Sequence, residues 1–336
     1  MFMKTFRRVI LFSALIMQAC CMPAENMIPD SMTVTSQPIE IPAAGPTDAG
    51  SVGEVIAYCH QPMTGGSLHQ IYTIDLDGSN NGRLIEASIG LNHIDWSPDA
   101  RKIAAAGYVD PSTWSIHVFD LASGELTRLT DDSGVLDSEP SWSPDGTSIV
   151  FTRTFPQQDN RDEIWVMKAD GSNQGWTGVE GFAAEWSPDG TRFIYISNRS
   201  GNYEVYTSSI DGTHEQQLTS TASDESSPTW SPDGSRIAYS ASTGTWNTRE
   251  NALTYEIHIM DADGSHARQL TNNTAYDGEP RWSPDGSRIV FSSDAAETGH
   301  WEIYVMNADG SDRKQVTHTP SNATAINPAW RPRPGP

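Results

Sequence analysis

Cysteine, basic residues and long apolar runs are all scarce in this sequence. The 336 residues include 3 cysteines, too few for a disulfide framework. Lysine and arginine number 21 against 43 aspartates and glutamates, and the resulting formal charge of −22 argues against a binder of nucleic-acid phosphates. Only one apolar run is present, which excludes a bundle of membrane-spanning helices.

The amino terminus has the pattern of a secretory signal. Lys4, Arg7 and Arg8 precede the apolar run 9–19, which is about half as long as a membrane-spanning helix. The segment Ile-Met-Gln-Ala-Cys at 16–20 resembles a bacterial lipobox, in which cleavage precedes a lipid-modified cysteine. We therefore expect a signal peptide over 1–19, lipidation of Cys20 and an extracytoplasmic, membrane-anchored protein, periplasmic or at the cell surface. Plain secretion and an uncleaved anchor are the alternatives.

Between this leader and the body, residues 20–52 are rich in Pro, Thr, Ser and Ala and show no sustained period. Such a composition predicts a flexible tether. The body then runs over 53–332, and residues 333–336 form a short tail.

A repeat dominates the body. The tetrapeptide Trp-Ser-Pro-Asp begins at residues 96, 142, 186, 230 and 282, at intervals of 46, 44, 44 and 52, and Trp330-Arg331-Pro332 is a degenerate sixth copy. A second marker, a turn after an apolar strand, is centred on glycines 78, 124, 171, 212, 264 and 310. A period of this length suits a four-stranded propeller blade.

Each repeat predicts four antiparallel strands, A to D, with A ending at the tryptophan. In the last full unit, 288–292 and 302–306 are apolar on both faces, as a sheet packed between two neighbours requires. The body opens on a B strand at 55–58 and closes on an A strand at 325–331. We therefore predict an all-β, six-bladed propeller whose carboxyl-terminal strand completes the first blade, which removes the open sheet edges.

The segments 139–151, 227–239 and 279–291 (EPSWSPDGTSIVF, SPTWSPDGSRIAY and EPRWSPDGSRIVF) resemble the WD-like repeats of TolB-type β-propellers, and 305–317 is similar to the second half of that repeat. The resemblance covers 53–332. It implies the fold and leaves the function open, because many roles use this repeat. TolB also carries a separate amino-terminal α/β domain, for which residues 20–52 are too short, so the resemblance does not imply membership of the Tol system.

Several conspicuous side chains occupy repeat positions, which favours structural roles. His117 and His258 take the strand-C position that is aromatic in the other blades, and a shared glutamate position favours a structural hydrogen bond. The members of that set are Glu163, Glu204, Glu256 and Glu302.

The sequence predicts that the working surface lies on one side of the ring. In such a blade the A–B and C–D turns share one face, here the turn face, and the B–C and D–A connections share the other, here the variable face. The B–C connections 59–69, 107–114, 154–162, 241–255 and 293–301 are long and dissimilar, as functional loops on a rigid scaffold tend to be.

Acidic and aromatic side chains on this variable face predict a protein, peptide or glycan partner of basic character, bound by a monomer. The predicted contact residues are Asp137, Glu139, Asp224, Glu225, Asp277, Glu279, Trp114, Trp246 and Trp301. Solvated loops that only keep the protein soluble are the alternative.

Catalytic signatures are missing: Gly-x-Ser-x-Gly, His-Glu-x-x-His, Cys-x-x-Cys and a phosphate loop do not occur. The sequence therefore favours a non-catalytic binding scaffold without a cofactor. The alternative is a polysaccharide-active enzyme, because oligogalacturonate lyases resemble this repeat and place metal-binding histidines at the channel mouth. The candidates for such a divalent-metal site are His60, His69, His93 and His300.

Overall fold

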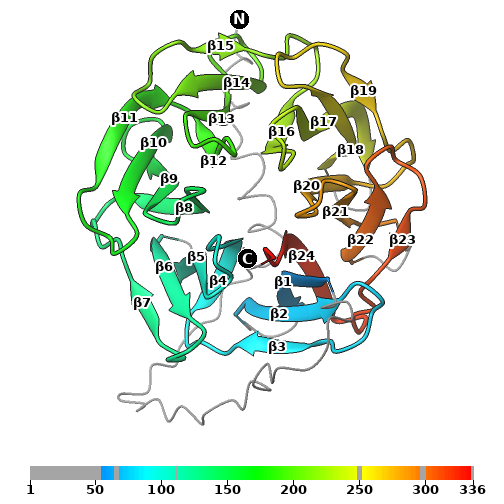
Figure 1. The fold of residues 1–336 in the computed structure, drawn as a ribbon, viewed down its shortest axis with the longest axis horizontal. Coiled ribbons are helices and arrows are strands. Elements are labelled where there is room, and N and C mark those ends of the chain that lie inside the picture. The colour runs from blue at the N-terminus through cyan, green and yellow to red at the C-terminus, as the bar shows by residue number, and fades with distance from the viewer. Residues whose placement is uncertain (1–53, 64–67, 111, 248–251, 296–299, 334–336) are drawn as a thin grey trace, which may run out of the picture.

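The computed structural model describes residues 54–63, 68–110, 112–247, 252–295 and 300–333. Within them, 24 strands form six four-stranded antiparallel sheets, arranged as blades around a central channel (Figure 1). The predicted all-β, six-bladed propeller is thereby confirmed. No helix in these ranges is long and apolar enough to cross a membrane. The predicted signal peptide, Cys20 and the tether lie outside the described residues.

The blades are numbered in ring order, and each is given from the channel outward. Blade 1 consists of β24 (Ala323–Trp330), β1 (Val55–Pro62), β2 (Gln70–Asp75) and β3 (Gly82–Ile85). Blade 2 consists of β4 (Gly90–Trp96), β5 (Lys102–Tyr108), β6 (Trp114–Asp120) and β7 (Leu126–Arg128). Blade 3 consists of β8 (Leu136–Trp142), β9 (Ser148–Phe155), β10 (Arg161–Lys168) and β11 (Gly175–Glu180).

The second half of the ring repeats this plan. Blade 4 consists of β12 (Phe182–Trp186), β13 (Arg192–Ser197), β14 (Glu204–Ser209) and β15 (Gln216–Gln217). Blade 5 consists of β16 (Glu225–Trp230), β17 (Arg236–Asn247), β18 (Ala252–Asp261) and β19 (Arg268–Gln269). Blade 6 consists of β20 (Asp277–Trp282), β21 (Arg288–Ser293), β22 (Glu302–Asn307) and β23 (Lys314–Gln315).

Hydrophobic packing joins neighbouring blades through the repeat tryptophans. Trp282, which is 6% exposed, packs with Ile257 and Ile259 of blade 5 and with Phe291 of its own blade. Burying such a side chain contributes several kcal/mol, on the order of the 3–5 kcal/mol that a Trp→Ala change costs in a core. Strands B and C are therefore apolar on both faces because each blade packs between two neighbouring blades.

The ring closes as the sequence predicts. β24 pairs with β1 antiparallel, from Ile56 opposite Trp330 to Pro62 opposite Ala323. Trp330 is buried between blades 1 and 6, where its indole Nε1 donates to the carbonyl of Arg281 at 3.2 Å. The last strand thus covers an edge of β1 that would otherwise expose unpaired backbone groups.

The turns that begin with Ser-Pro-Asp repeat the same hydrogen bonds on the turn face. Ser231 donates its hydroxyl to Asp233 at 2.6 Å, and Asp233 also accepts the amide of Ser235 at 3.0 Å. Gly234 adopts a φ of 69°, which favours glycine, and it faces the ring of Pro188 in the preceding blade. Equivalent serine–aspartate bonds occur in the other four tetrapeptides.

The repeat-position glutamates and histidines have the structural roles expected. Glu302 accepts the hydroxyl of Thr317 and, at 2.8 Å, the amide of Thr319, which fixes the exit of the outermost strand. His117 and His258 lie opposite Ala105 and Tyr239 on the neighbouring strand, in the position that Tyr304 occupies opposite Phe291.

Candidate binding site at the channel and variable face

A β-bulge in every innermost strand points one residue per blade toward the channel. The residue three places before each repeat tryptophan has a positive φ between 47° and 56°, and all six strands shift register against the next strand at this point. The six residues are His93, Glu139, Ala183, Ser227, Glu279 and Asn327. A left-handed conformation is costly for non-glycine residues, so its recurrence shows that the surrounding contacts impose it.

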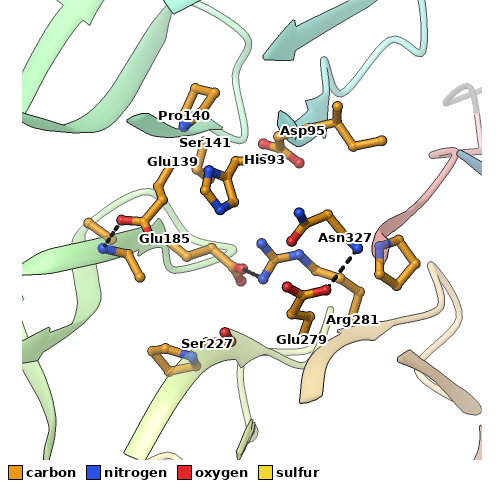
Figure 2. Close-up of a pocket in the computed structure, with 15 residues that line it drawn as sticks. His93, Asp95, Glu139, Pro140, Ser141, Glu185, Ser227, Glu279, Arg281 and Asn327 are labelled. Atoms are coloured by element: carbon orange, nitrogen blue, oxygen red, sulfur yellow. Dashed lines mark hydrogen bonds and ion pairs between the residues drawn. The ribbon is translucent and has the colours of Figure 1, made fainter. Parts of the chain in front are cut away.

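Two of these bulge residues hold the next blade in place. Glu139 Oε2 accepts the backbone amide of Ala183 at 2.8 Å, and Glu279 Oε2 accepts that of Asn327, also at 2.8 Å (Figure 2). Each carboxylate also accepts a hydroxyl of its own blade, from Thr152 in one case and from Ser292 in the other. Both glutamates therefore connect adjacent bulges through charge-assisted hydrogen bonds.

The residue directly before the repeat tryptophan is polar in blades 2 to 6, where these residues form a second polar ring, whereas blade 1 has Ala329 at this position. Asp95 Oδ2 accepts the amide of Trp142 at 2.7 Å, and Glu185 Oε1 accepts that of Trp230 at 2.9 Å, so each carboxylate again reaches the following blade. Arg281 of blade 6 extends past blade 5 to Glu185 of blade 4, with 3.2 Å between Nη1 and Oε2 (Figure 2). This bridge crosses the channel.

These two rings enclose a polar cavity of about 80 Å³. Its volume suits a few water molecules, since one water needs roughly 10–15 Å³ of such space, and is small for an organic substrate. The cavity is lined by the carboxylates of the two rings, by Arg281 and His93, and by prolines that directly follow bulge residues.

Burial dominates the electrostatics of the cavity. It raises the pKa of Asp95 to about 7, against the opposing effects of the Trp142 amide and Arg281. It also raises the pKa values of Glu139 and Glu185, while the Arg281 guanidinium opposes the shift in both. Burial lowers the pKa of His93 to about 4, so the imidazole is neutral at physiological pH.

Three of the four candidate metal ligands lie around the junction of blades 1 and 2. His60 stacks on Tyr72 with ring centroids 4.5 Å apart, and His69 meets Tyr108 edge-on at 5.5 Å. Burial, with smaller contributions from His93 and His60, lowers the pKa of His69 to about 4, so the imidazoles influence one another.

The fourth candidate, His300, has its Nε2 3.2 Å from Glu302 Oε1. Within the described ranges, no group of three or more His, Cys, Asp or Glu side chains could hold a metal ion. Metal binding by these histidines stays a prediction.

The predicted contact residues of the variable face separate into two environments. Glu139 and Glu279 line the channel, whereas Asp137, Glu225 and Asp277 are at most 2% exposed at the start of their innermost strands. Asp224 is half-buried and accepts the amide of Tyr203 at 3.1 Å. The acidic side chains are therefore engaged within the fold, and their part in binding stays a prediction.

The predicted aromatics are less exposed than the loop positions suggested. Trp114 is 7% exposed and stacks on Tyr108, because β6 begins at this residue and places it between strands. Trp301 is half-buried, with its ring centroid 4.3 Å from that of Tyr276. Trp246 pairs with Leu253 in the β17–β18 ladder, and its side chain lies outside the described part of the chain.

Sequence reasoning missed Asp95, Glu185, Arg281 and Asn327, which complete the channel lining. A signal was present, because all four stand one or three residues before a repeat tryptophan. A bulge cannot be read from the residue pattern, however, so the inward direction of these positions was not apparent.

The family comparison agrees with this geometry: the model described as TolB beta propeller domain matches residues 70–251 and 248–334. The chain belongs to this family. The Tol-Pal system protein TolB of Francisella tularensis subsp. mediasiatica is 25% identical over 236 residues, which cover 68% of this chain and 51% of that protein. A TolB homolog of Chlorobium chlorochromatii is 30% identical over 149 residues, with 34% of each chain covered. The chain spans a quarter to a half of the length of the curated relatives that it matches.

Solved structures share the fold. TolB from Acinetobacter baumannii superposes with a TM-score of 0.71 at 24% identity, covering 83% of this chain and 67% of that one. An oligogalacturonate lyase in complex with manganese gives a TM-score of 0.50 at 16% identity, covering 80% and 74%. At these identities the likeness concerns the fold alone.

Proposed function

We propose that this protein is an extracytoplasmic, lipid-anchored scaffold whose propeller binds a protein, peptide or glycan partner of basic character on its variable face. The observation that carries the proposal is the way in which the channel is used. Its carboxylates bond to the next blade or to Arg281, so the polar groups hold the ring together. Among the described residues these carboxylates form no pair of nucleophile and base of the kind that covalent catalysis needs.

Location and partner follow from different parts of the chain. The lipobox-like segment ending at Cys20 supports anchoring, and the strongly acidic body supports attraction of a basic partner. A metal-dependent polysaccharide-active enzyme is the alternative class. Among the described residues, the similarity of fold is the only observation that supports it.

Photo-crosslinking in the native host tests which face binds. A crosslinking residue is placed at Ala222 or Asn272, both exposed on D–A connections, and at Arg101 or Ala122, both exposed on the turn face. We expect a discrete crosslinked species from the first pair and none from the second. Equal products from both faces, or none from any position, would refute binding on the variable face.

A further inference from the structure

Three blades begin with a buried carboxylate, five residues before the repeat tryptophan. These are Asp137 in blade 3, Glu225 in blade 5 and Asp277 in blade 6, which are 1%, 2% and 0% exposed. A buried carboxylate requires a partner, because desolvation of an unpaired charge costs several kcal/mol, on the order of the penalty for each ion of a buried pair.

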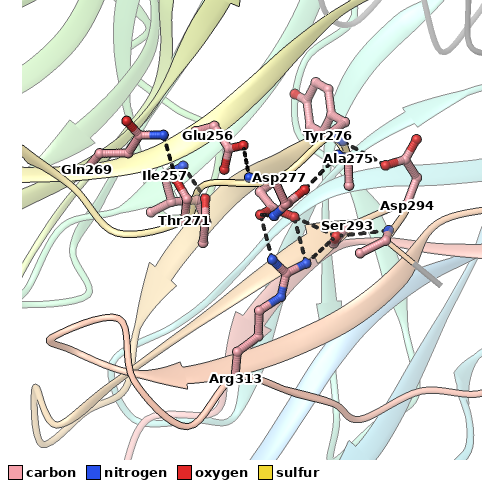
Figure 3. A network of polar contacts seen from close by, with 12 residues as sticks. Glu256, Ile257, Gln269, Thr271, Ala275, Tyr276, Asp277, Ser293, Asp294 and Arg313 are labelled. Atoms are coloured by element: carbon pink, nitrogen blue, oxygen red, sulfur yellow. Dashed lines mark hydrogen bonds and ion pairs between the residues drawn. The ribbon is translucent and has the colours of Figure 1, made fainter.

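In blades 3 and 6 the partner is an arginine. Arg153 Nε and Nη2 lie 2.7 and 2.8 Å from the two oxygens of Asp137. Arg313 Nη1 and Nη2 lie 2.9 and 3.0 Å from those of Asp277 (Figure 3). Both pairs have the bidentate geometry that guanidinium and carboxylate groups favour.

The same two guanidinium groups also lie on an aromatic pair. Arg153 is 4.4 Å from the ring centroid of Trp165 and 5.4 Å from that of Phe151, while Arg313 is 4.9 and 5.2 Å from Tyr304 and Phe291. Yet Arg153 comes from strand B (β9), whereas Arg313 directly precedes the outermost strand, β23. Two different sequence positions thus deliver the same group to the same place, which identifies a guanidinium site built from a carboxylate and two cross-strand rings.

Blade 5 keeps the site but has neither arginine. Ala241 lies opposite Glu225, as Arg153 lies opposite Asp137. Ala267 follows the turn glycine Gly264 by three residues, as Arg313 follows Gly310.

The aromatic pair of blade 5 is nevertheless present, with the rings of Tyr239 and His258 5.5 Å apart. Burial lowers the pKa of His258, so its ring is neutral at physiological pH and presents no competing charge. Among the described residues, no arginine or lysine is paired with Glu225.

In place of a cation, Glu225 meets a second carboxyl group. It accepts the hydroxyl of Thr221 at 2.7 Å and lies against Glu204 of blade 4, which is 1% exposed and whose Oε2 has no hydrogen-bond donor in the described structure. Burial and the contact with Glu204 raise the pKa of Glu225 to about 8. The corresponding pair at the junction of blades 5 and 6 is Glu256 of blade 5 with Asp277 of blade 6, and there Arg313 offsets the repulsion.

We propose that the junction of blades 4 and 5 binds the guanidinium group of an arginine side chain supplied by a protein partner. Glu225 and Glu204 would form the ion pair, and Tyr239 and His258 would stack on the planar cation. A guanidinium matches a carboxylate and a ring face together better than an ammonium does. The proposal rests on the proposed function and names the chemistry of its partner.

The equivalent site of blade 6 indicates how a side chain would enter. Arg313 reaches Asp277 from the outer strand, and its side chain remains 24% exposed. In blade 5, Ala267 is exposed at the corresponding position and His258 is half-buried. An arginine from outside would therefore follow the path that Arg313 takes within its own blade.

The experiment uses the full chain and N-acetyl-arginine amide, titrated by NMR, with the citrulline analogue as the uncharged control. We expect a dissociation constant on the order of 1 mM for the arginine probe, typical of a single small group, and no binding of citrulline. Glu225→Gln should weaken binding at least tenfold, the effect of losing one charge-assisted pair.

Ala267→Arg supplies the missing arginine from within, as in blade 6. It should raise the melting temperature and abolish binding of the probe, whereas the matched Ala267→Gln variant should do neither. Binding that is unchanged in Glu225→Gln or in Ala267→Arg would overturn the proposal.

Arg249 lies outside the described residues and is tested separately. If Arg249→Ala bound the probe while the wild type did not, the chain would fill its own site and the proposal would be wrong. If the arginine site is wrong but the scaffold binds its partner on the variable face, crosslinking at Ala222 and Asn272 would still occur. The two proposals can therefore be refuted independently.

Discussion

The two faces of the ring are built differently. On the turn face, five Ser-Pro-Asp turns repeat one set of bonds, and in the last four the following glycine faces the proline of the turn before. On the variable face, the carboxylate that begins the innermost strand meets Arg153 in blade 3, Arg313 in blade 6 and another carboxyl group in blade 5. Contacts that recur from blade to blade stabilise the ring, whereas positions whose side chains differ between blades are available for binding a partner.

Loss of the closing strand should have the largest effect. Deletion of residues 325–336 removes most of β24, exposes the edge of β1 and unpacks Trp330. We expect a loss of at least about 3–5 kcal/mol from the tryptophan alone, and failure of cooperative unfolding. Thermal unfolding followed by circular dichroism measures it. An unchanged melting temperature would show that the ring does not depend on this strand.

Removal of the arginine that crosses the channel should come next. Arg281→Met leaves Glu185 without its cation and removes the charge that opposes protonation of Asp95 and Glu139. The expected cost is about 1–3 kcal/mol, that of a charge-assisted bond in a partly exposed site. Arg281→Lys should recover part of it in chemical denaturation, and Arg101→Met on the turn face serves as the exposed control. Equal stability of Arg281→Met and Arg101→Met would show that the Arg281–Glu185 ion pair does not stabilise the fold.

One turn aspartate should matter less than the channel arginine. Asp233→Ala removes the acceptor for the Ser231 hydroxyl and the Ser235 amide. A cost of about 1 kcal/mol is expected, as for loss of a capping side chain. Asp233→Asn keeps an acceptor and should retain most of the stability. A loss in Asp233→Asn as large as in Asp233→Ala would point to charge instead of the local hydrogen bonds.

The smallest effect is a pH dependence of opposite sign for the two groups of carboxylates. On the turn face, hydrogen bonds from neighbouring serine and threonine residues lower the pKa values of Asp189, Asp233 and Asp285 to about 2. Their stabilisation is present above the ordinary carboxyl pKa of about 4 and is lost as pH falls toward about 2.

Near the channel and at the blade 4–5 junction, burial raises the pKa of Asp95 to about 7 and that of Glu225 to about 8. The folded state then holds the extra protons, so stability decreases as pH rises from about 4 to about 8. An Asp95→Asn, Glu225→Gln variant should melt a few degrees higher than wild type at about pH 8 and equally at about pH 4. A difference of the same size at both pH values would contradict protonation as the cause.

Sequence reasoning reached the architecture because the signals for it were periodic. The spacing of Trp96, Trp142 and their equivalents fixed the number of blades, and the order of strands at the two ends of the body predicted the pairing of β1 with β24. The site was less accessible. Glu279 and Arg281 point into the channel because of a bulge, and the arginine partners of Asp137 and Asp277 come from different strands. Both depend on three-dimensional register, which no local pattern encodes.

A paired comparison of Asp233→Ala with Glu225→Gln tests most directly whether the turn face stabilises the fold and the variable face binds the partner. For each variant, the melting temperature and the yield of the crosslink from Ala222 to the partner are measured together at about pH 7. We predict that Asp233→Ala lowers the melting temperature and leaves the crosslink unchanged, whereas Glu225→Gln keeps the fold and reduces the crosslink. Loss of the crosslink in Asp233→Ala at full folding would contradict the assignment of binding to the variable face, and its persistence in Glu225→Gln would contradict the arginine site at the junction of blades 4 and 5.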